Sequence, residues 1–231
     1  MTGIPIINVN NNCSTGSTAL YLARQAVESG SADCVLALGF EQMRPGALGD
    51  IYTDRPSPFG EFNDTCEQLV GNSHIPLALR YFGGAGKSHM DKYGTTMKDF
   101  AKIRAKASRH ASKNPLALFK KEVSEEEVLN SPIMWPGVMT RLMACPPTCG
   151  GAAAILVSEK FAKKHNIDAS VKILAQSMTT DYESTFAEKD MMQLVGYDMT
   201  KEAARDVYHQ TGVDVQDIDV VELHDCFAHN E

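Results

Sequence analysis

No uninterrupted apolar run in this sequence approaches the roughly 20 residues that a membrane-spanning helix needs, so we expect no membrane insertion. The first residues, MTGIPIINVNNN, contain neither a basic region nor a long apolar stretch and lack the pattern of a secretory signal. Basic residues are also in the minority, because 22 Lys and Arg stand against 29 Asp and Glu, a formal net charge of -7. This balance argues against a nucleic-acid-binding surface and against a basic patch for membrane docking.

The cysteines lack the spacing of a metal site or of a disulfide framework. None of them forms a C-x-x-C pair, and no second cysteine or histidine pair complements Cys145 and Cys149. We therefore expect no metal, no covalently bound cofactor, and reduced thiols in a reducing compartment. The six positions are Cys13, Cys34, Cys66, Cys145, Cys149 and Cys226.

The 231 residues are enough for one large domain or two modest ones, with the composition of a soluble globular protein. Residues 4–9 and 33–40 predict buried strands, and the apolar spacing between them predicts a helix that stops near Gly30. This order, strand, helix, strand, is typical of a βαβ unit with parallel strands. Both ends of the chain lie beside apolar runs, which we interpret as the ends of an internal fragment.

The rest of the chain also predicts an α/β fold. Residues 41–145 are rich in turns and helices and are interpreted as a mostly helical insertion, long enough to have a role of its own. Ser124 and Glu127 predict a capping box at the start of a short helix. The remaining predictions are helices at 76–93, 96–112 and 159–165, a helix within 201–213 that stops at Gly212, and strands at 150–158, 171–178 and 217–227.

Cys13 is the first candidate for chemistry. It lies between a predicted strand and the start of a predicted helix, where free backbone N–H groups and the helix dipole favour a thiolate. Its small neighbours Ser14, Gly16 and Ser17 leave room for a substrate. The alternative is that Cys13 is only a small residue packed at a strand end.

His224, Asp225 and Cys226 are the second candidate, at the end of the last predicted strand. A histidine there can donate to a developing oxyanion, and a cysteine can shuttle a proton. The alternative is a chance trio of polar residues at the start of a loop. Cys13 and Cys226 are far apart in the sequence, so only the fold can bring them together.

These segments together resemble the thiolase family. Asn-Asn-Asn-Cys-Ser-Thr-Gly-Ser-Thr-Ala-Leu at 10–20 is similar to the nucleophile segment of thiolases, and His-Asp-Cys-Phe at 224–227 is similar to the signature of the sterol carrier protein x type. The flanking segments that resemble this type are ADCVLALGFEQM, GGAGKSHMDKYGTT, GYDMTKEAAR and DIDVVELHDCF.

The resemblance implies an αβαβα sandwich and cleavage of 3-oxoacyl-CoA by CoA, with both as substrates. Residues 1–160 would form the N-terminal thiolase domain without its first strands, and 161–231 the beginning of the C-terminal domain. By the same resemblance Cys13 is the nucleophile, His224 contributes to an oxyanion hole, and Cys226 is the acid/base. The resemblance also implies a homodimer, a peroxisomal location (otherwise a cytoplasmic one), and substrates that include 2-methyl-branched and sterol side-chain types.

One departure from the family pattern keeps a second hypothesis open. The family's Gly-His-Pro segment, whose histidine activates the nucleophile, does not occur in these 231 residues. Under this second hypothesis, the chain is a catalytically incomplete thiolase-like protein that binds lipid or acyl-CoA, or regulates a partner. A related open point concerns Lys87, His89 and Lys92, which are either CoA phosphate contacts or, as we favour, part of a solvated helix face.

Overall fold

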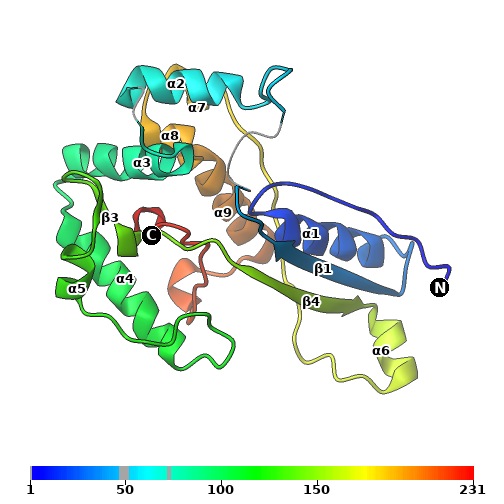
Figure 1. Cartoon of the computed structure of the whole chain (residues 1–231). Coiled ribbons are helices and arrows are strands. Elements are labelled where there is room, and N and C mark those ends of the chain that lie inside the picture. The colour runs from blue at the N-terminus through cyan, green and yellow to red at the C-terminus, as the bar shows by residue number, and fades with distance from the viewer. Residues whose placement is uncertain (1, 47–51, 72–73) are drawn as a thin grey trace. The chain divides into compact units, whose positions relative to one another are not determined.

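A computed structural model describes residues 2–46, 52–71 and 74–231 of the protein (Figure 1). The chain forms two compact units, each assembled from segments far apart in the sequence. Unit 1 comprises Met1–Asp50, Pro147–Thr179 and Ala203–Val213. Unit 2 comprises Ile51–Pro146, Thr180–Glu202 and Asp214–Glu231.

Unit 1 is built on a pair of long antiparallel strands. Each residue of the first strand faces one of the second, from Cys34 opposite Val157 to Gln42 opposite Cys149. The first helix packs against this pair, as Figure 1 shows in blue and green. The elements of unit 1 are α1 (Thr15–Glu28), β1 (Cys34–Gln42), β4 (Cys149–Val157) and α6 (Glu159–His165).

The helix and strand positions in unit 1 confirm several predictions, but the predicted parallel βαβ unit is wrong. β1 pairs with β4, in antiparallel register, and residues 4–9 are extended without belonging to a strand. The predicted burial is wrong as well, since Ile6 and Phe40 are each 79% exposed. A strand is buried only when another layer covers its face, and among the described residues α1 supplies that layer on its own side alone.

Two more predicted strands, at 171–178 and 217–227, are wrong for a related reason. Neither segment forms a strand in the described residues. The first has no assigned pairing, and the second begins in a short 3-10 helix that ends at Asp217 and makes one isolated antiparallel bridge, between Phe227 and Ala144. Val171 is 91% and Val220 is 82% exposed. The β-branched residues indicated only that these side chains favour a strand. A strand also needs a neighbouring strand whose backbone N–H and C=O groups pair with its own.

Unit 2 is mostly helical. Helices predicted at 76–93 and 96–112 are confirmed. The helix predicted within 201–213 begins earlier, at Tyr197, and ends just before Gly212 as expected, so that α9 (Tyr197–Thr211) contributes residues to both units. The other elements are α2 (Gly60–Val70), α3 (Leu77–Tyr93), α4 (Met97–Ser112), α5 (Glu125–Leu129), β2 (Ile133–Trp135), β3 (Met139–Thr140), η1 (Arg141–Met143), α7 (Ser184–Ala187), α8 (Met191–Leu194), η2 (Val215–Asp217) and η3 (Ala228–Asn230).

The predicted capping box at the start of α5 is confirmed. The Ser124 hydroxyl accepts from the Glu127 amide at 3.1 Å, and the Glu127 carboxylate accepts from the Ser124 amide at 2.8 Å. Two orphan N–H groups of a five-residue helix are satisfied in this way. The partition into an N-terminal domain 1–160, with an insertion at 41–145, and a C-terminal beginning 161–231 stays a prediction.

Two apolar clusters hold unit 2 together. The larger one joins α4 and α5 to the end of the chain, and Phe227 and Ala228 are both buried in it. The smaller one joins α2, α3 and α8 around the buried Cys66, and burial raises the pKa of that thiol. Among the described residues, no helix has the length and apolar character needed to cross a membrane. The members of the larger cluster are Phe100, Ala101, Val128, Val138, Met139, Met143, Phe227 and Ala228.

A run of small residues explains why α3 can pack so closely in this unit. Gly83, Gly84, Ala85 and Gly86 are all buried. A Cβ atom on Gly83 would lie 2.8 Å from the Trp135 ring, and one on Gly84 would lie 2.8 Å from the methyl group of Met191. Glycine inside a helix costs about 1 kcal/mol of helix stability relative to alanine. Here the absence of side chains allows α3 to contact Trp135 of β2 and Met191 of α8.

Candidate active site

Cys13 lies in a tight turn that leads into α1. The amides of Ser14 and Thr15 donate to the carbonyls of Asn11 and Asn12 at 3.0 and 3.1 Å, and Asn12 has a left-handed φ of 47°. Cys13 is exposed, so the predicted alternative of a cysteine packed at a strand end does not describe this position. The nucleophile candidate is therefore accessible to a substrate.

The N-terminal end of α1 is left open beside this thiol. Ser14 occupies the N-cap position, but its hydroxyl donates to the carbonyl of Asn11 at 2.8 Å and makes no capping bond to the helix. The first amides of an α-helix have no acceptor within the helix. They form a positive end that stabilises a nearby thiolate or a substrate oxyanion.

A close helix–strand contact holds this turn in place. An added Cβ on Gly39 of β1 would lie 3.3 Å from the Cα of Gly16 in α1, a distance that leaves little space for a side chain. Gly16 is three residues after Cys13, so the backbone contact fixes the turn that carries the thiol. From the sequence, Gly16 was expected only to leave room for a substrate, and its packing role against Gly39 was not predicted.

The His224–Cys226 segment belongs to unit 2, where Phe227 anchors it. Phe227 is buried and stacks on Phe82 of α3, with ring centroids 5.0 Å apart. The amide of Cys145 donates to the carbonyl of Cys226 at 2.8 Å. His224 is exposed and Cys226 is half-buried against the larger cluster. The sequence analysis assigned no role to Phe227, although its position after the polar trio is the signal of an anchor.

The predicted site residues therefore divide between the two units. His224 and Cys226 are brought together in one anchored segment, in which the side-chain Nδ2 of Asn230 donates to the Cys226 sulfur at 3.9 Å. Cys13 lies in unit 1. That Cys13 meets His224 and Cys226 in one active site stays a prediction.

His229, which the sequence analysis did not single out, is the most perturbed titratable group of this segment. Its Nε2 donates to the carbonyl of Val138 at 3.0 Å, and its ring lies 4.1 Å from the Phe100 ring between centroids. Nδ1 is buried and has no hydrogen-bond partner among the described residues. Because burial disfavours the charged imidazolium, the pKa of His229 falls to about 4.

This burial predicts that unit 2 loses stability on mild acidification. Below pH 6.5 this histidine takes up a proton in the unfolded chain, whereas in the folded protein it does so only near pH 4. The free energy of unfolding therefore falls by up to ~3 kcal/mol as the pH drops from 6.5 to 4, and it levels off below pH 4. Urea unfolding between pH 7 and pH 4 measures the loss. H229Q is expected to weaken this dependence, whereas H110Q, at an exposed position of α4, should retain it. Equal pH profiles for H229Q and the unmodified protein would contradict the assignment.

Gly86 provides a second test of how this segment docks. A Cβ on Gly86 would overlap Cδ2 of His229 and lie 3.2 Å from its Cβ. We expect G86A to destabilise unit 2 by about 1–3 kcal/mol, although alanine is the better helix former. The free energy of unfolding is to be measured in a double-mutant cycle with H229A, in which most of the penalty should disappear. G60A, at the start of α2 in open space, is the matched control and should be neutral or slightly stabilising.

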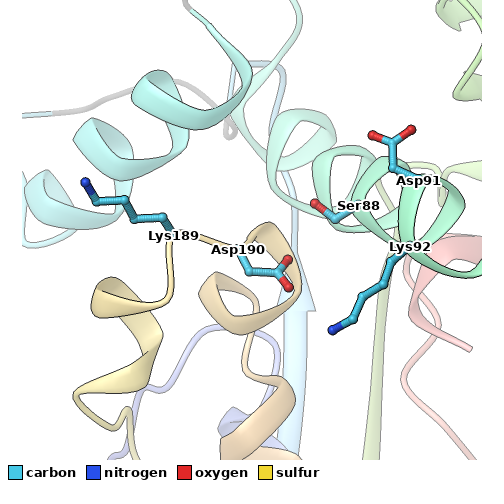
Figure 2. Close-up of a pocket in the computed structure, with 5 residues that line it drawn as sticks. All are labelled: Ser88, Asp91, Lys92, Lys189 and Asp190. Atoms are coloured by element: carbon cyan, nitrogen blue, oxygen red, sulfur yellow. The ribbon is translucent and has the colours of Figure 1, made fainter.

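A shallow, open pocket of about 390 Å³ lies between α3 and α8 in unit 2. Figure 2 shows Lys92 and Asp190 turned toward the same space, while the ammonium group of Lys189 points away from it. Asp190 also caps α8, since it accepts from the Met192 amide at 2.9 Å. Two acidic and two basic side chains line the pocket, from α3 and from the residues just before α8. We assign no ligand to it. Its lining residues are Ser88, Asp91, Lys92, Lys189 and Asp190.

The contacts of α3 agree with a solvated helix face, the interpretation favoured from the sequence for its basic residues. Lys87 pairs with Asp91 at 2.8 Å, and His89 Nδ1 lies 2.7 Å from the Thr95 hydroxyl. In the described ranges, no group of three or more His, Cys, Asp or Glu side chains is placed so that it could hold a metal ion.

Comparisons with known proteins place this geometry in context. The family described as "Thiolase, N-terminal domain" matches residues 1–131. "Sterol carrier protein 2" of Oryctolagus cuniculus is 52% identical over 233 residues, which are 100% of this chain and 42% of that protein. "Non-specific lipid-transfer protein-like 2" of Caenorhabditis elegans is 40% identical over 237 residues, covering 100% of this chain and 57% of that protein.

Solved structures share the fold at much lower identity. The dimeric peroxisomal thiolase of Saccharomyces cerevisiae matches with a TM-score of 0.67 and 21% sequence identity, over 96% of this chain and 58% of that one. At this identity the likeness concerns the fold alone. The chain thus spans less than half the length of the rabbit relative and somewhat more than half of the yeast structure.

Proposed function

The chain belongs to the thiolase family, and from this premise we propose that it carries the nucleophilic half of an acyltransferase that cleaves 3-oxoacyl-CoA with CoA through an acyl-cysteine. The α/β thiolase fold predicted from the sequence is confirmed by the structural neighbours. The single observation that carries the proposal is the exposed Cys13 in a turn at the uncapped N-terminal end of α1. The sulfur there is accessible to a substrate, and the amides at the start of a helix favour a substrate oxyanion nearby.

In the proposed reaction the Cys13 sulfur attacks the 3-oxo carbon of the substrate. His224 donates to the oxyanion that forms, a contribution of about 3–4 kcal/mol for one such donor. The bond between carbons 2 and 3 then breaks, and its electron pair goes to the departing enolate of acetyl-CoA, or of propanoyl-CoA for a 2-methyl-branched chain. The Cys226 thiol gives its proton to that enolate. In the second half the Cys226 thiolate takes the proton of the CoA thiol, the CoA sulfur attacks the acyl carbon, and the bond from that carbon to the Cys13 sulfur breaks. Cys13 leaves as the thiolate that began the cycle and Cys226 is a thiol again, so one difficult cleavage becomes two easier steps.

The substrate range and setting of the reaction are part of the same proposal. The proposed substrates include 2-methyl-branched and sterol side-chain 3-oxoacyl-CoA, as the sequence resemblance implies, and the name "Sterol carrier protein 2" supports the sterol part. The proposal includes a homodimer and a role in peroxisomal β-oxidation, which the sequence resemblance implies; the yeast neighbour, which is alike in fold, is described as dimeric and peroxisomal. No part of the proposal requires a metal or a bound cofactor, because CoA enters as substrate.

A CoA-dependent cleavage assay tests this function. The 231-residue chain and the longest reading frame that contains it are each incubated with a 3-oxoacyl-CoA and free CoA. We expect equal amounts of acetyl-CoA and the shortened acyl-CoA, measured by chromatography, from the longer protein. Absence of both products with straight and 2-methyl-branched substrates would overturn the proposal.

The second candidate is a non-catalytic protein that binds lipid or acyl-CoA. It is favoured by the name of the C. elegans relative, "Non-specific lipid-transfer protein-like 2". Titration with a non-hydrolysable acyl-CoA separates the two candidates. Saturable binding of this analogue, together with no turnover of a 3-oxoacyl-CoA in the cleavage assay, would favour this second function if it is seen in the longer protein as well as in the chain.

A further inference from the structure

The connection between α4 and α5, the α4–α5 loop, has an apolar tip. Figure 1 shows this loop in green, where it extends past the end of α4 before it returns to α5. Residues 115–119 read PLALF, and within them Leu116, Leu118 and Phe119 are 92%, 64% and 54% exposed. Large apolar side chains gathered at the surface in this way mark sites that bind a partner or a membrane.

Hydrogen bonds hold the loop closed. Asn114 forms a turn, because its side-chain Oδ1 accepts from the Leu116 amide at 2.9 Å and its carbonyl accepts from the Ala117 amide at 3.1 Å. At the base, the Ser112 hydroxyl donates to the Glu122 carboxylate at 2.9 Å and joins the two ends of the loop. The loop has this shape before it meets a partner, which lowers the conformational entropy that docking costs.

Basic side chains flank the apolar tip. Lys113 precedes it, Lys120 and Lys121 follow it directly, and all three are exposed. Lys121 pairs with Glu127 of α5 at 3.2 Å. Neither Lys113 nor Lys120 has an ion pair among the described residues. The tip therefore combines exposed apolar side chains with two cations that keep their charge for a partner.

Other exposed apolar segments of the chain have acidic neighbours instead. Phe40, which is 79% exposed, is followed by Glu41, and Val220, which is 82% exposed, is preceded by Asp219. The chain as a whole carries a net charge of -7, from which we expected no basic patch for membrane docking. An anionic surface repels such a chain except where the local charge is positive, so the α4–α5 loop would meet that surface first.

We propose that the α4–α5 loop docks on the surface of an anionic phospholipid bilayer, with Leu116, Leu118 and Phe119 inserted below the headgroups. Lys113 and Lys120 then lie at the level of the lipid phosphates, because lysine keeps its ammonium group in water while its stem covers apolar surface. A weak apolar anchor becomes a stable one when basic residues add a second attraction. A second copy of the loop fits less well, since it would bring like charges together.

Flotation with lipid vesicles tests the proposal. The 231-residue chain and the longest reading frame that contains it are each mixed with vesicles of phosphatidylcholine and phosphatidylserine, and with vesicles of phosphatidylcholine alone. We expect both proteins to float with the anionic vesicles and the bound fraction to fall as salt is raised. Equal binding to both kinds of vesicle, or no binding, would overturn the proposal. Binding by the shorter chain alone would overturn it too, because the longer protein would then cover the loop.

Two double variants separate the apolar contribution from the charge. L116S/F119S removes apolar area from the tip, and K113E/K120E reverses the two flanking charges. Each lysine near an anionic surface strengthens binding about fivefold, so we expect each double variant to bind anionic vesicles at least about tenfold more weakly. Vesicle binding like that of the unmodified protein in either variant would contradict the proposed contact.

Controls outside the loop show whether the contact is local. I133S replaces an apolar side chain of the same unit that is 68% exposed, on β2. K160E/K164E makes the same change of charge at exposed positions of α6. Both should bind within about twofold of the unmodified protein, since exposed charges act over roughly 10 Å at moderate salt. A control that weakened binding as much as the loop variants would overturn the assignment to the loop.

This inference does not rest on the proposed function, because the α4–α5 loop takes no part in the cleavage. L116S/F119S in the longer protein should keep the kcat of the unmodified protein for a soluble 3-oxoacyl-CoA when vesicles are absent. Cleavage without vesicle binding would overturn the docking surface alone. Vesicle binding by a longer protein that cleaves no substrate would overturn the proposed function alone.

Discussion

C13A is expected to abolish the acyl-enzyme and to lower the rate of 3-oxoacyl-CoA cleavage on the order of 10³-fold or more. The reason is that no other side chain in the turn from Asn11 to Ser14 is a thiol, so the first bond to the 3-oxo carbon has no comparable nucleophile. The loss should appear in kcat rather than in KM, because the truncated side chain acts in the reaction and not in holding the substrate. Steady-state kinetics with a 3-oxoacyl-CoA and saturating CoA measure it.

C34A is the matched control for this loss. Cys34 is also an exposed cysteine of unit 1, at the first residue of β1, and the sequence analysis gave it no chemistry. We expect C34A to keep the kcat of the unmodified protein. If C13A retained more than about a tenth of the activity, the loss would be too small for a covalent nucleophile, and the mechanism would be wrong.

F227A is expected to have the largest effect on stability, about 3–5 kcal/mol, the usual cost of removing a buried aromatic side chain. Phe227 is 5% exposed, stacks on Phe82, and belongs to the larger apolar cluster of unit 2. Its removal leaves a cavity and frees the segment that carries His224 and Cys226. Urea unfolding gives the free energy, and hydrogen exchange of the Cys145 amide reports whether the segment has detached.

The control for this truncation is F119A in the same unit. Phe119 is 54% exposed, so its removal should change the free energy of unfolding by less than about 0.5 kcal/mol. A protein whose stability changed equally in F227A and F119A would show that Phe227 is no anchor. If F227A were as stable as the unmodified protein but its Cys145 amide exchanged hydrogen quickly, the substitution would have detached only the segment that carries His224 and Cys226.

The helices were the part of this fold that the sequence predicted well. Apolar spacing and a capping pair are local signals, so α3 and α5 were predicted from their own residues. The strands were harder. Residues 33–40 and 150–158 were expected as strands but not as partners, because register and direction depend on pairing between distant segments.

The candidate site shows the same division between local and distant information. The position of Cys13 before a helix was predictable, because the turn and α1 are encoded by neighbouring residues. The docking of Phe227 on Phe82 and of His229 against Gly86 was not, since each contact joins segments more than a hundred residues apart.

The segment Gly83–Gly86 illustrates how a local rule fails for a physical reason. Three glycines within four residues argue against a helix, since each lowers helix stability. The residues are nonetheless in the middle of α3, because a tryptophan, a methionine and a histidine from other elements occupy the space where their side chains would be. The resemblance to the thiolase family identified this segment, and the structure supplies the reason for it.

The most direct test of the account is to trap the acyl group on its residue. The protein is mixed with a 3-oxoacyl-CoA in the absence of free CoA, quenched in acid, digested with trypsin and analysed by mass spectrometry. Residues 1–24 contain one cysteine, Cys13, and we predict that this peptide carries the shortened acyl chain and loses it when CoA is added before the quench. An acyl group on a different peptide, or none on residues 1–24 of a protein that cleaves the substrate, would contradict the claim that Cys13 is the nucleophile.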